Sequence, residues 1–275
     1  MRATLISLET LWQDLRYGLR QLWSSPGFTT VAILTLALGI GVNTSIFTLL
    51  DALLLRPLAV PNSSRVVGIY RGEERPCSYP DFIDFQRRAS AFSGLAADLT
   101  TESVLDVNDT SEIVLAELVS NNYAAALEVQ PVLGRWFSSD SDADRIPAVI
   151  SYRTWQSRFG GDPQVIGKQV RVESQPYTVV AVAPKDFQGM ALPVMTDVWV
   201  PIASYAKYNA FAAGIVSNRT GGHVLMFGRL APGVTAAQAS AQMNALDAQL
   251  RREFRRNNKQ INGMTHNKFS RLYNV

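Results

Sequence analysis

The sequence predicts an α+β protein in which one N-terminal transmembrane helix precedes a mostly soluble region of mixed helices and strands. Residues 21–50 contain no charged side chain and form a long, mainly apolar run. Beyond this run, strand-like and helix-like stretches follow one another without a strict β-α-β alternation, which favours α+β over α/β. Hydrophobic residues make up 47% and charged residues 18% of the chain. This composition supports a packed core rather than disorder.

The predicted transmembrane helix covers residues 28–56. A bilayer core requires about 20 consecutive apolar residues, and a helix satisfies its own backbone there. The alternatives are a buried core helix, which the length of the uncharged run disfavours, and a cleaved signal peptide. A signal peptide has a shorter apolar region that ends at a small-x-small site. This run ends instead in Leu53-Leu-Leu-Arg-Pro57, so we expect a retained anchor.

Small residues recur at every fourth position along one face of this helix, at Ala37, Gly41 and Ser45. In lipid, small residues at this spacing let helix backbones approach closely. The pattern therefore predicts a face that packs against other transmembrane helices. The alternative is the ordinary glycine and alanine content of a single-pass anchor.

Residues 1–25 are expected to form a separate amphipathic helix. Leucine and tryptophan recur there at three- and four-residue steps, with charged residues between them. This pattern is typical of a helix that lies on the membrane surface and contacts lipid. Ser24-Ser-Pro-Gly27 separates it from the spanning helix. Positive charges flank the span almost equally, so the short N-terminal arm decides the expected orientation, with the N-terminus cytoplasmic.

The soluble region carries several local helix signals. Ser78 is expected to cap a helix that Pro80 and Asp81 continue, and Gly160 to end a helix that starts at Tyr152. Asn122 is expected to cap a short helix, 123–128. A capping box of Thr235 and Gln238 opens a helix that runs to residue 256. Strands are expected at 65–70, 95–107, 113–119, 147–150, 168–173, 177–182, 197–201 and 223–230, with hairpins at 95–119 and 168–182.

Signatures of catalysis and of cofactor binding do not occur in the sequence. It contains no Walker A stretch, no Gly-x-Ser-x-Gly elbow and no His-Glu-x-x-His. One cysteine, Cys77, cannot form an internal disulfide or a cysteine-based zinc site. His223 is expected to form hydrogen bonds at a strand end. Asp81 and Asp84 resemble a carboxylate pair, but we expect a capping residue and a surface residue. The sequence therefore predicts no enzyme activity, no cofactor and no metal site.

The excess of positive charge is small and lies mostly between residues 251 and 271. Anionic lipid and nucleic acid are both conceivable partners for such a basic stretch. No aromatic stacking platform or nucleic-acid motif accompanies it, so we expect a solvated helix end and no nucleic-acid partner.

Several stretches, in family order, resemble the permease subunits of MacB-type (type VII) ABC transporters, in particular the duplicated orphan permeases, which are FtsX-like. The resemblance covers residues 10 to 250. It is carried by Asp14-Leu-Arg-Tyr-Gly-Leu-Arg20, Ala37-Leu-Gly-Ile-Gly-Val-Asn-Thr-Ser-Ile-Phe47, Leu53-Leu-Leu-Arg-Pro-Leu58, Ser78-Tyr-Pro-Asp-Phe82, Ser90-Ala-Phe-Ser-Gly-Leu-Ala96, Val132-Leu-Gly-Arg-Trp-Phe137, Trp155-Gln-Ser-Arg-Phe-Gly-Gly-Asp-Pro163 and Leu230-Ala-Pro-Gly-Val234.

The resemblance implies a MacB-like periplasmic core domain over residues 57–256, behind a helix in the bacterial inner membrane. Its porter-like part would comprise 57–107 and 223–256, and its β-rich, sabre-like part 108–222. Such permeases couple ATP hydrolysis by a separate cytoplasmic ABC ATPase subunit to movement of the periplasmic domain, for export or for work on envelope partners. The N-terminal helix resembles the one that contacts the ATPase, which implies that role for Leu15, Arg16, Tyr17, Leu19 and Arg20.

A permease of this family continues with three more transmembrane helices, and no further apolar span appears before Val275. Residues 257–275 form a polar, atypical tail. We therefore expect a truncated or frameshifted chain that needs the remaining permease helices or a second permease copy as partner. The alternative is a single-pass, membrane-anchored binding or sensor module on the extracytoplasmic side. An anchored enzyme is a third class, disfavoured because no catalytic constellation is found.

Overall fold

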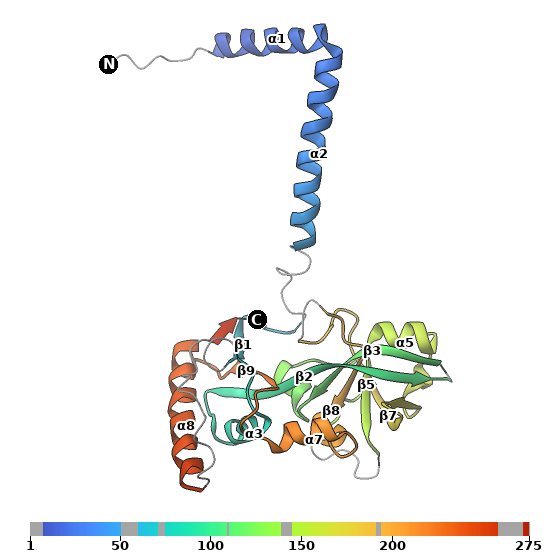
Figure 1. The fold of residues 1–275 in the computed structure, drawn as a ribbon, viewed down its shortest axis with the longest axis vertical. Coiled ribbons are helices and arrows are strands. Elements are labelled where there is room, and N and C mark those ends of the chain that lie inside the picture. The colour runs from blue at the N-terminus through green and yellow to red at the C-terminus, as the bar shows by residue number, and fades with distance from the viewer. Residues whose placement is uncertain are drawn as a thin grey trace. The chain divides into compact units, whose positions relative to one another are not determined.

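A computed structural model describes residues 8–50, 60–70, 75–108, 110–138, 145–190, 194–257 and 272–274. The chain forms two compact units, Met1–Arg56 and Pro57–Val275. Their helices and strands are shown in Figure 1. In chain order they are α1 (Leu8–Ser24), α2 (Pro26–Leu50), η2 (Ser63–Arg65), β1 (Val66–Ile69), α3 (Tyr79–Arg88), β2 (Phe92–Val107), β3 (Thr110–Val119), α4 (Tyr123–Leu127), β4 (Leu133–Gly134), β5 (Pro147–Ile150), α5 (Tyr152–Phe159), η3 (Pro163–Val165), β6 (Gln169–Val172), β7 (Gln175–Val182), β8 (Val198–Pro201), α6 (Ile202–Tyr205), α7 (Ala210–Ser217), β9 (Leu225–Leu230), α8 (Ala236–Asn257) and β10 (Leu272–Asn274).

The first unit consists of α1 and α2, which meet at a sharp bend at Ser25 (Figure 1). The hydroxyl of Thr29 in α2 donates to the carbonyl of Leu22, 2.7 Å away, and so ties the second helix to the end of the first. Within α2, Pro26–Thr48 is long and apolar enough to cross a membrane. This agrees with the predicted span, whose last residues, 51–56, lie outside the described part of the chain.

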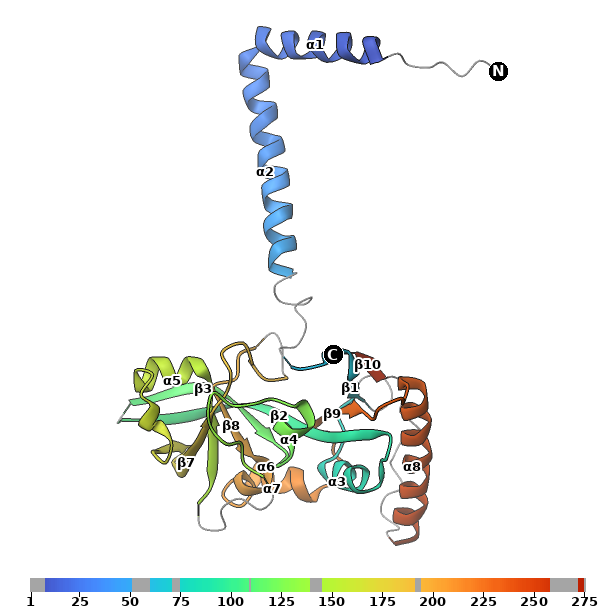
Figure 2. The same ribbon diagram turned by 180° about the vertical axis from the view of Figure 1, so that it is seen from behind.

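The second unit is built on one ten-stranded sheet with the order β10-β1-β9-β2-β3-β8-β5-β7-β4. Strand β6 pairs with both β7 and β2, so that β2, β3, β8, β5, β7 and β6 close into a ring. The long strand β2 joins this ring to β9, β1 and β10, because its first half pairs with β9 and its second half with β6. Figure 2 shows α8 at the β1–β9 end of the unit and α5 near the far end of the β2–β3 hairpin.

Buried side chains form two clusters on opposite faces of the sheet. The first contains Leu105, Val172 and Val198 of the ring, together with the apolar faces of α3, α7 and α8. The second is rich in aromatic residues and contains Tyr123, Trp136, Phe137, Phe187, Trp199 and Phe227. Because both faces of the central strands are covered, those strands carry few exposed positions.

Local capping signals account for several boundaries. The Ser78 hydroxyl accepts from the Asp81 N–H at 3.2 Å, and Pro80 lies in the first turn of α3. Gly160 ends α5 in the left-handed conformation, with φ 61°. The Thr235–Gln238 capping box is also present, because each side chain bonds to the other residue's backbone N–H. These predictions are confirmed.

One expectation about helices was wrong, and one helix was not predicted. Asn122 precedes α4, but its side chain makes no capping bond and donates instead to the carbonyl of Leu95, 2.8 Å away. Helix α7 was not expected, because its sequence Ala-Phe-Ala-Ala-Gly-Ile-Val-Ser is apolar nearly all round and shows no helical period. The tail 257–275 contributes β10, which pairs antiparallel with β1.

Candidate functional site

The predicted packing face of the transmembrane helix lies on the exposed surface of α2. Ala37, Gly41 and Ser45 are all exposed in the described structure. The Ser45 hydroxyl donates to the carbonyl of Gly41, 2.8 Å away, so its polar group is satisfied within the helix. A small residue whose hydroxyl is already bonded can face a neighbouring helix in lipid without a further partner. Packing through this face stays a prediction.

The predicted ATPase-contacting residues lie on α1. Arg16, Tyr17 and Arg20 are exposed, while the side chains of Leu15 and Leu19 lie outside the described part of the structure. Trp12 and Trp23 are also largely exposed on this helix. A helix with exposed aromatic and basic side chains suits contact with a lipid surface or with another protein. The assignment to an ATPase stays a prediction.

Arg219 joins two helices of the second unit, α3 and α8. Its Nη1 lies 2.6 Å from Oδ1 of Asp81 and 2.8 Å from Oδ2 of Asp84, both on α3. The contact with Asp84 lacks hydrogen-bond alignment and is therefore ionic. The guanidinium also stacks over the ring of Phe254 on α8, 3.6 Å from the ring centre. We call these four residues the Arg219 clamp.

The Arg219 clamp revises the expected roles of the two carboxylates. Asp81 is a helix-start residue as predicted, but it is also buried and paired. Asp84 is not a surface residue, because its side chain is only 14% exposed. Sequence reasoning missed Arg219, which follows α7 in a short polar stretch without a recognisable pattern. The pair therefore serves as an ion-pair anchor for Arg219.

A second buried cation, Arg229 on β9, supports helix α4. Its Nη2 donates to the carbonyl of Leu127 at 2.8 Å, and its Nε donates to that of Ala126 at 3.1 Å. These carbonyls belong to the last turn of α4, where a helix leaves its acceptors unsatisfied and favours positive charge. A further bond, 3.3 Å long, reaches the carbonyl of Asn62 before β1. Arg229 thus connects β9, α4 and the start of the unit.

Two carboxylates lie inside the aromatic cluster. Glu117 of β3 accepts from the hydroxyl of Tyr123 at 3.0 Å, from the backbone N–H of Met190 at 2.8 Å and from the indole N–H of Trp199. Asp98 of the adjacent strand β2 is fully buried, and neither of its oxygens has a hydrogen-bond partner among the described side chains and backbone. Burial, and next the charge of Glu117, raise the pKa of Asp98 well above its ordinary value.

The same environment keeps Tyr123 protonated. Burial and the nearby charge of Glu117 raise the pKa of Tyr123 well above its ordinary value, so that its hydroxyl remains a donor. Sequence reasoning did not single out either carboxylate. Glu117 and Asp98 alternate with apolar residues, and such alternation is also typical of strands with one solvated face.

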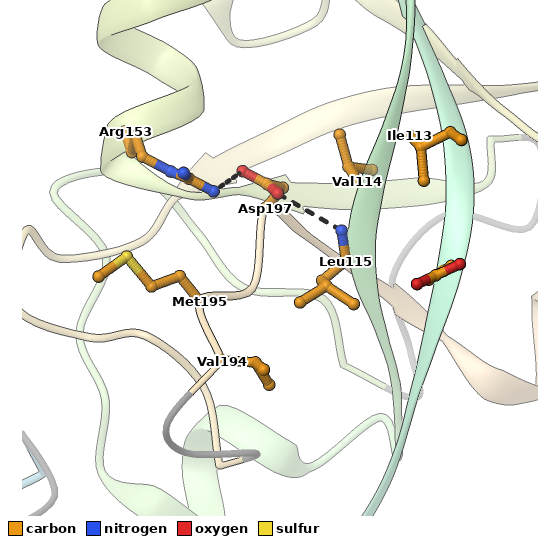
Figure 3. Close-up of a pocket in the computed structure, with 8 residues that line it drawn as sticks. Ile113, Val114, Leu115, Arg153, Val194, Met195 and Asp197 are labelled. Atoms are coloured by element: carbon orange, nitrogen blue, oxygen red, sulfur yellow. Dashed lines mark hydrogen bonds and ion pairs between the residues drawn. The ribbon is translucent and has the colours of Figure 1, made fainter. Parts of the chain in front are cut away.

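A groove runs beside the outer part of β3 (Figure 3). It has a volume of about 390 Å³ and is bordered by Ile113, Val114 and Leu115 on one side and by Val194 and Met195 on the other. Arg153 of α5 lies at its edge and forms an ion pair of 2.6 Å with Asp197. Apolar and charged side chains thus share its lining, which suits a peptide better than a metal or a phosphate.

The described residues contain no group of three or more histidine, cysteine or acidic side chains placed to hold a metal ion. Cys77 is fully buried, so a thiol reagent would not reach it in the folded protein. The backbone N–H of His223 donates to the carbonyl of Cys77 at 3.0 Å, and its ring lies edge-on to Phe211. These contacts agree with the structural role expected for His223. His266 and the acidic stretch 139–144 lie outside the described residues.

Comparisons with known structures reveal the same fold. The chain resembles a crystallised domain assigned to a permease protein from Porphyromonas gingivalis, with TM-score 0.53 and 18% identity over 70% of this chain and 86% of that one. It also resembles the periplasmic region of MacB from Actinobacillus actinomycetemcomitans, with TM-score 0.53 and 13% identity over 73% of this chain and 86% of that one. A comparison with curated proteins gives no match.

The sequence model of one protein family covers most of the chain, from α2 into α8. This family is described as the MacB-like periplasmic core domain, and its model matches residues 29–246. The matched range includes most of the membrane-span candidate, nearly all of the first buried cluster and all of the second. The chain therefore belongs to the MacB-like periplasmic core domain family, with an N-terminal part like that of MacB-type permeases.

Proposed function

We propose that this chain is the N-terminal portion of an ABC transporter permease subunit. In this proposal, its extracytoplasmic domain couples ATP hydrolysis by a separate cytoplasmic subunit to export or to mechanical work in the envelope. The observation that carries the proposal is the family match, which includes most of the spanning helix as well as most of the domain. One apolar helix of sufficient length near the N-terminus supports a membrane anchor.

The domain boundaries and partners expected from the sequence enter this proposal unchanged. Residues 57–107 and 223–256 would form the porter-like part, and 108–222 the sabre-like part. The face of Ala37, Gly41 and Ser45 would receive the remaining permease helices or a second permease copy. The protein would reside in the bacterial inner membrane, and its catalytic step would belong to the ATPase partner.

A co-purification experiment tests the coupling. The full chain would be expressed with a candidate ABC ATPase subunit and recovered in mild detergent. Retention of the ATPase, and its loss in Tyr17→Ala and Arg20→Gln, are the expected results, since both side chains are exposed on α1. Arg252→Gln is the matched control, because it makes the same arginine-to-glutamine change at an exposed position on α8, outside α1. If no ABC ATPase is retained, the coupling proposal fails.

A thiol-labelling experiment tests the orientation. Because Cys77 is buried, the maleimide should not label it, and cysteines introduced at exposed positions report the orientation. Ala203→Cys, on α6, should react with a membrane-impermeant maleimide once the outer membrane is permeabilised, whereas Gln13→Cys, on α1, should react only after lysis. The reverse order of labelling would contradict a cytoplasmic N-terminus.

The second candidate function is a membrane-anchored binding or sensor module. The groove beside β3 favours a binding role, because exposed apolar and charged side chains line it together. A chain that binds an extracytoplasmic partner but never retains an ATPase would support this reading over the first.

A further inference from the structure

Strand β3 leaves part of its outer edge without a neighbouring strand. It pairs with β2 over its whole length, but with β8 only from Ala116 to Val119. Just before that stretch, the Asp197 N–H donates to the Leu115 carbonyl at 2.9 Å, and the Leu115 N–H points to Oδ2 of Asp197 at 3.4 Å. Among the described strands, none pairs with this side of β3 before Ala116.

The directions of the backbone N–H and C=O groups on this edge follow from the alternating geometry of a strand. In an antiparallel pair, successive residues direct their N–H and C=O groups to opposite sides of the strand. Leu115 directs both groups away from β2, so Ile113 and Ser111 do the same. Val104 of β2 is the register partner of Ile113, and its N–H and C=O both bond to Glu173, on the side of β2 away from β3. Partners of this kind direct their backbone groups away from each other, so those of Ile113 point away from β2. Ser111 and Ile113 therefore present two donors and two acceptors on the free edge of β3, and Ile113 also lines the groove.

The groove lies where β8 would lie if that strand continued toward its N-terminus. The chain instead turns away, because the Thr196 N–H bonds to the carbonyl of Gln188 at 3.1 Å. Val194 and Met195 then form the opposite wall of the groove (Figure 3). Ile113 is 77% exposed, an unusual exposure for a branched apolar residue on a strand edge. The groove has the backbone chemistry of a missing strand.

We propose that this groove binds an extended segment of a second polypeptide, which adds to the free edge of β3 as a strand. The peptide groups of Ser111 and Ile113 bond to the backbone of the segment, as in other cases of strand addition. An apolar side chain of the segment packs against Ile113 and Met195. A basic side chain of the segment faces Glu102. The proposal does not depend on coupling to ATP hydrolysis.

The charge of the groove indicates which kind of segment binds there. Arg153 already has its partner in Asp197, at 2.6 Å, whereas Glu102 has no ion pair in the described structure. The groove therefore carries one uncompensated negative charge, which a lysine or arginine in the bound segment would complement.

A second copy of this chain suits the edge less well. Glu112 pairs with Arg158 of α5, so self-pairing through Ser111 and Ile113 would bring this ion pair against its own copy. The self-paired segment, 110–115, contains no lysine or arginine to complement Glu102. A register centred on Ile113 would place Ser111 opposite Leu115, whose groups are already bonded to Asp197. The partner is therefore a different polypeptide.

Fluorescence anisotropy with the purified full chain in detergent micelles tests the proposal. The probe is a labelled heptapeptide of alternating threonine and valine with a central lysine. Two control peptides replace the lysine by glutamate or carry N-methyl groups on alternate backbone amides. We expect saturable binding of the lysine peptide, and binding about tenfold weaker for the N-methylated peptide, since its donors to the edge are blocked.

Variants of the chain locate the binding. Ile113→Pro removes the N–H that Ile113 directs away from β2, so no bond to β2 is lost, and proline is tolerated on edge strands. The affinity for the lysine peptide should fall about tenfold. Ile113→Thr keeps the N–H and the fold, and should weaken binding less. Glu102→Gln should abolish the preference for lysine over glutamate. Asp186→Asn, an exposed acidic position outside the groove, is the control and should change nothing.

Several results would overturn the proposal. The first is a lysine peptide that shows no saturable binding. The second is an N-methylated peptide that binds as well as its parent. The third is unchanged affinity in Ile113→Pro while circular dichroism shows the native fold. Sedimentation velocity of the chain at two concentrations tests whether a second copy occupies the edge. A dimer that forms in the unmodified chain and dissociates in Ile113→Pro would overturn the proposal.

Discussion

Replacing Arg219 by methionine should strongly destabilise the second unit, because it removes the only described cation within 3 Å of Asp81 or Asp84. The Arg219 side chain is 19% exposed, and those of Asp81 and Asp84 are 5% and 14% exposed. The substitution leaves two nearly buried carboxylates side by side on α3. It also removes the cation from the ring of Phe254.

The magnitude follows from the desolvation of these charges. Removing one partner of a buried ion pair typically costs about 3–5 kcal/mol. Here the cost is smaller, because Asp81 lies at the start of α3, where the helix favours negative charge, and Arg88 remains 4.0 Å from Asp84. We expect about 2 kcal/mol from the carboxylates and about 1 kcal/mol from the lost cation–π contact. The free energy of unfolding should thus fall by about 3 kcal/mol.

Urea unfolding of the full chain in mild detergent measures this change, with the buried tryptophans of the second unit as fluorescent probes. Lys168→Met is the matched control. Lys168 also pairs with an aspartate, Asp162, and also lies over an aromatic ring, but its side chain is 45% exposed and that of Asp162 is 39% exposed. This substitution should cost much less, because water screens an exposed ion pair.

A double variant separates the loss of the attraction to Arg219 from the cost of leaving two buried carboxylates side by side. Adding Asp84→Asn to Arg219→Met removes one of the two carboxylates that face Arg219 and should restore about 1 kcal/mol. A cost for Arg219→Met no larger than that for Lys168→Met would refute the reasoning, because it would mean that these carboxylates are solvated in the folded protein.

Three further predictions concern the interior. Gly189→Ala should cost about 3 kcal/mol in urea unfolding, because φ is +92° and the new Cβ would lie 2.6 Å from Oε2 of Glu117. Gly160→Ala, with φ +61° and open space around it, should cost only about 1 kcal/mol. Because the pKa of Asp98 is raised in the folded state, the folded protein holds a proton that the unfolded chain releases. The free energy of unfolding should therefore fall as pH rises from the ordinary aspartate pKa through the raised one, and Asp98→Asn should flatten this dependence in urea titrations at several pH values. Cys77 should react with a colorimetric thiol reagent only at urea concentrations that unfold the domain, since it is fully buried; rapid reaction in native buffer would contradict this.

Features that depend on a few neighbouring residues were predictable from the sequence. Ser78, Gly160 and the Thr235–Gln238 pair mark helix ends through bonds to backbone groups within four residues. The hairpins β2–β3 and β6–β7 were predictable for the same reason, because turn residues separate alternating stretches.

Features that depend on distant pairing were not predictable. Nothing in the local pattern of Leu105 or Val172 indicates that β6 pairs with β2 and closes the ring. Arg219, which pairs with Asp81 from 138 residues away, lies in a stretch that reads as a loop. The free edge of β3 likewise exists only because β8 begins beside Ala116 rather than earlier. Both the clamp and the groove are products of topology.

Buried charges join the second unit at three places, which is what the proposed coupling function would require of a domain that moves as one body. Arg219 links α3 to α8, Arg229 links β9 to α4, and Glu117 links β3 to Trp199 and to the segment before β8. Apolar contacts are non-directional and tolerate sliding. A buried ion is stable only while its partners keep their geometry, because displacement strands a charge in a medium of low dielectric constant. Small relative movements of these elements therefore cost free energy. A displacement applied at one end of the sheet would consequently move the other end by a similar amount.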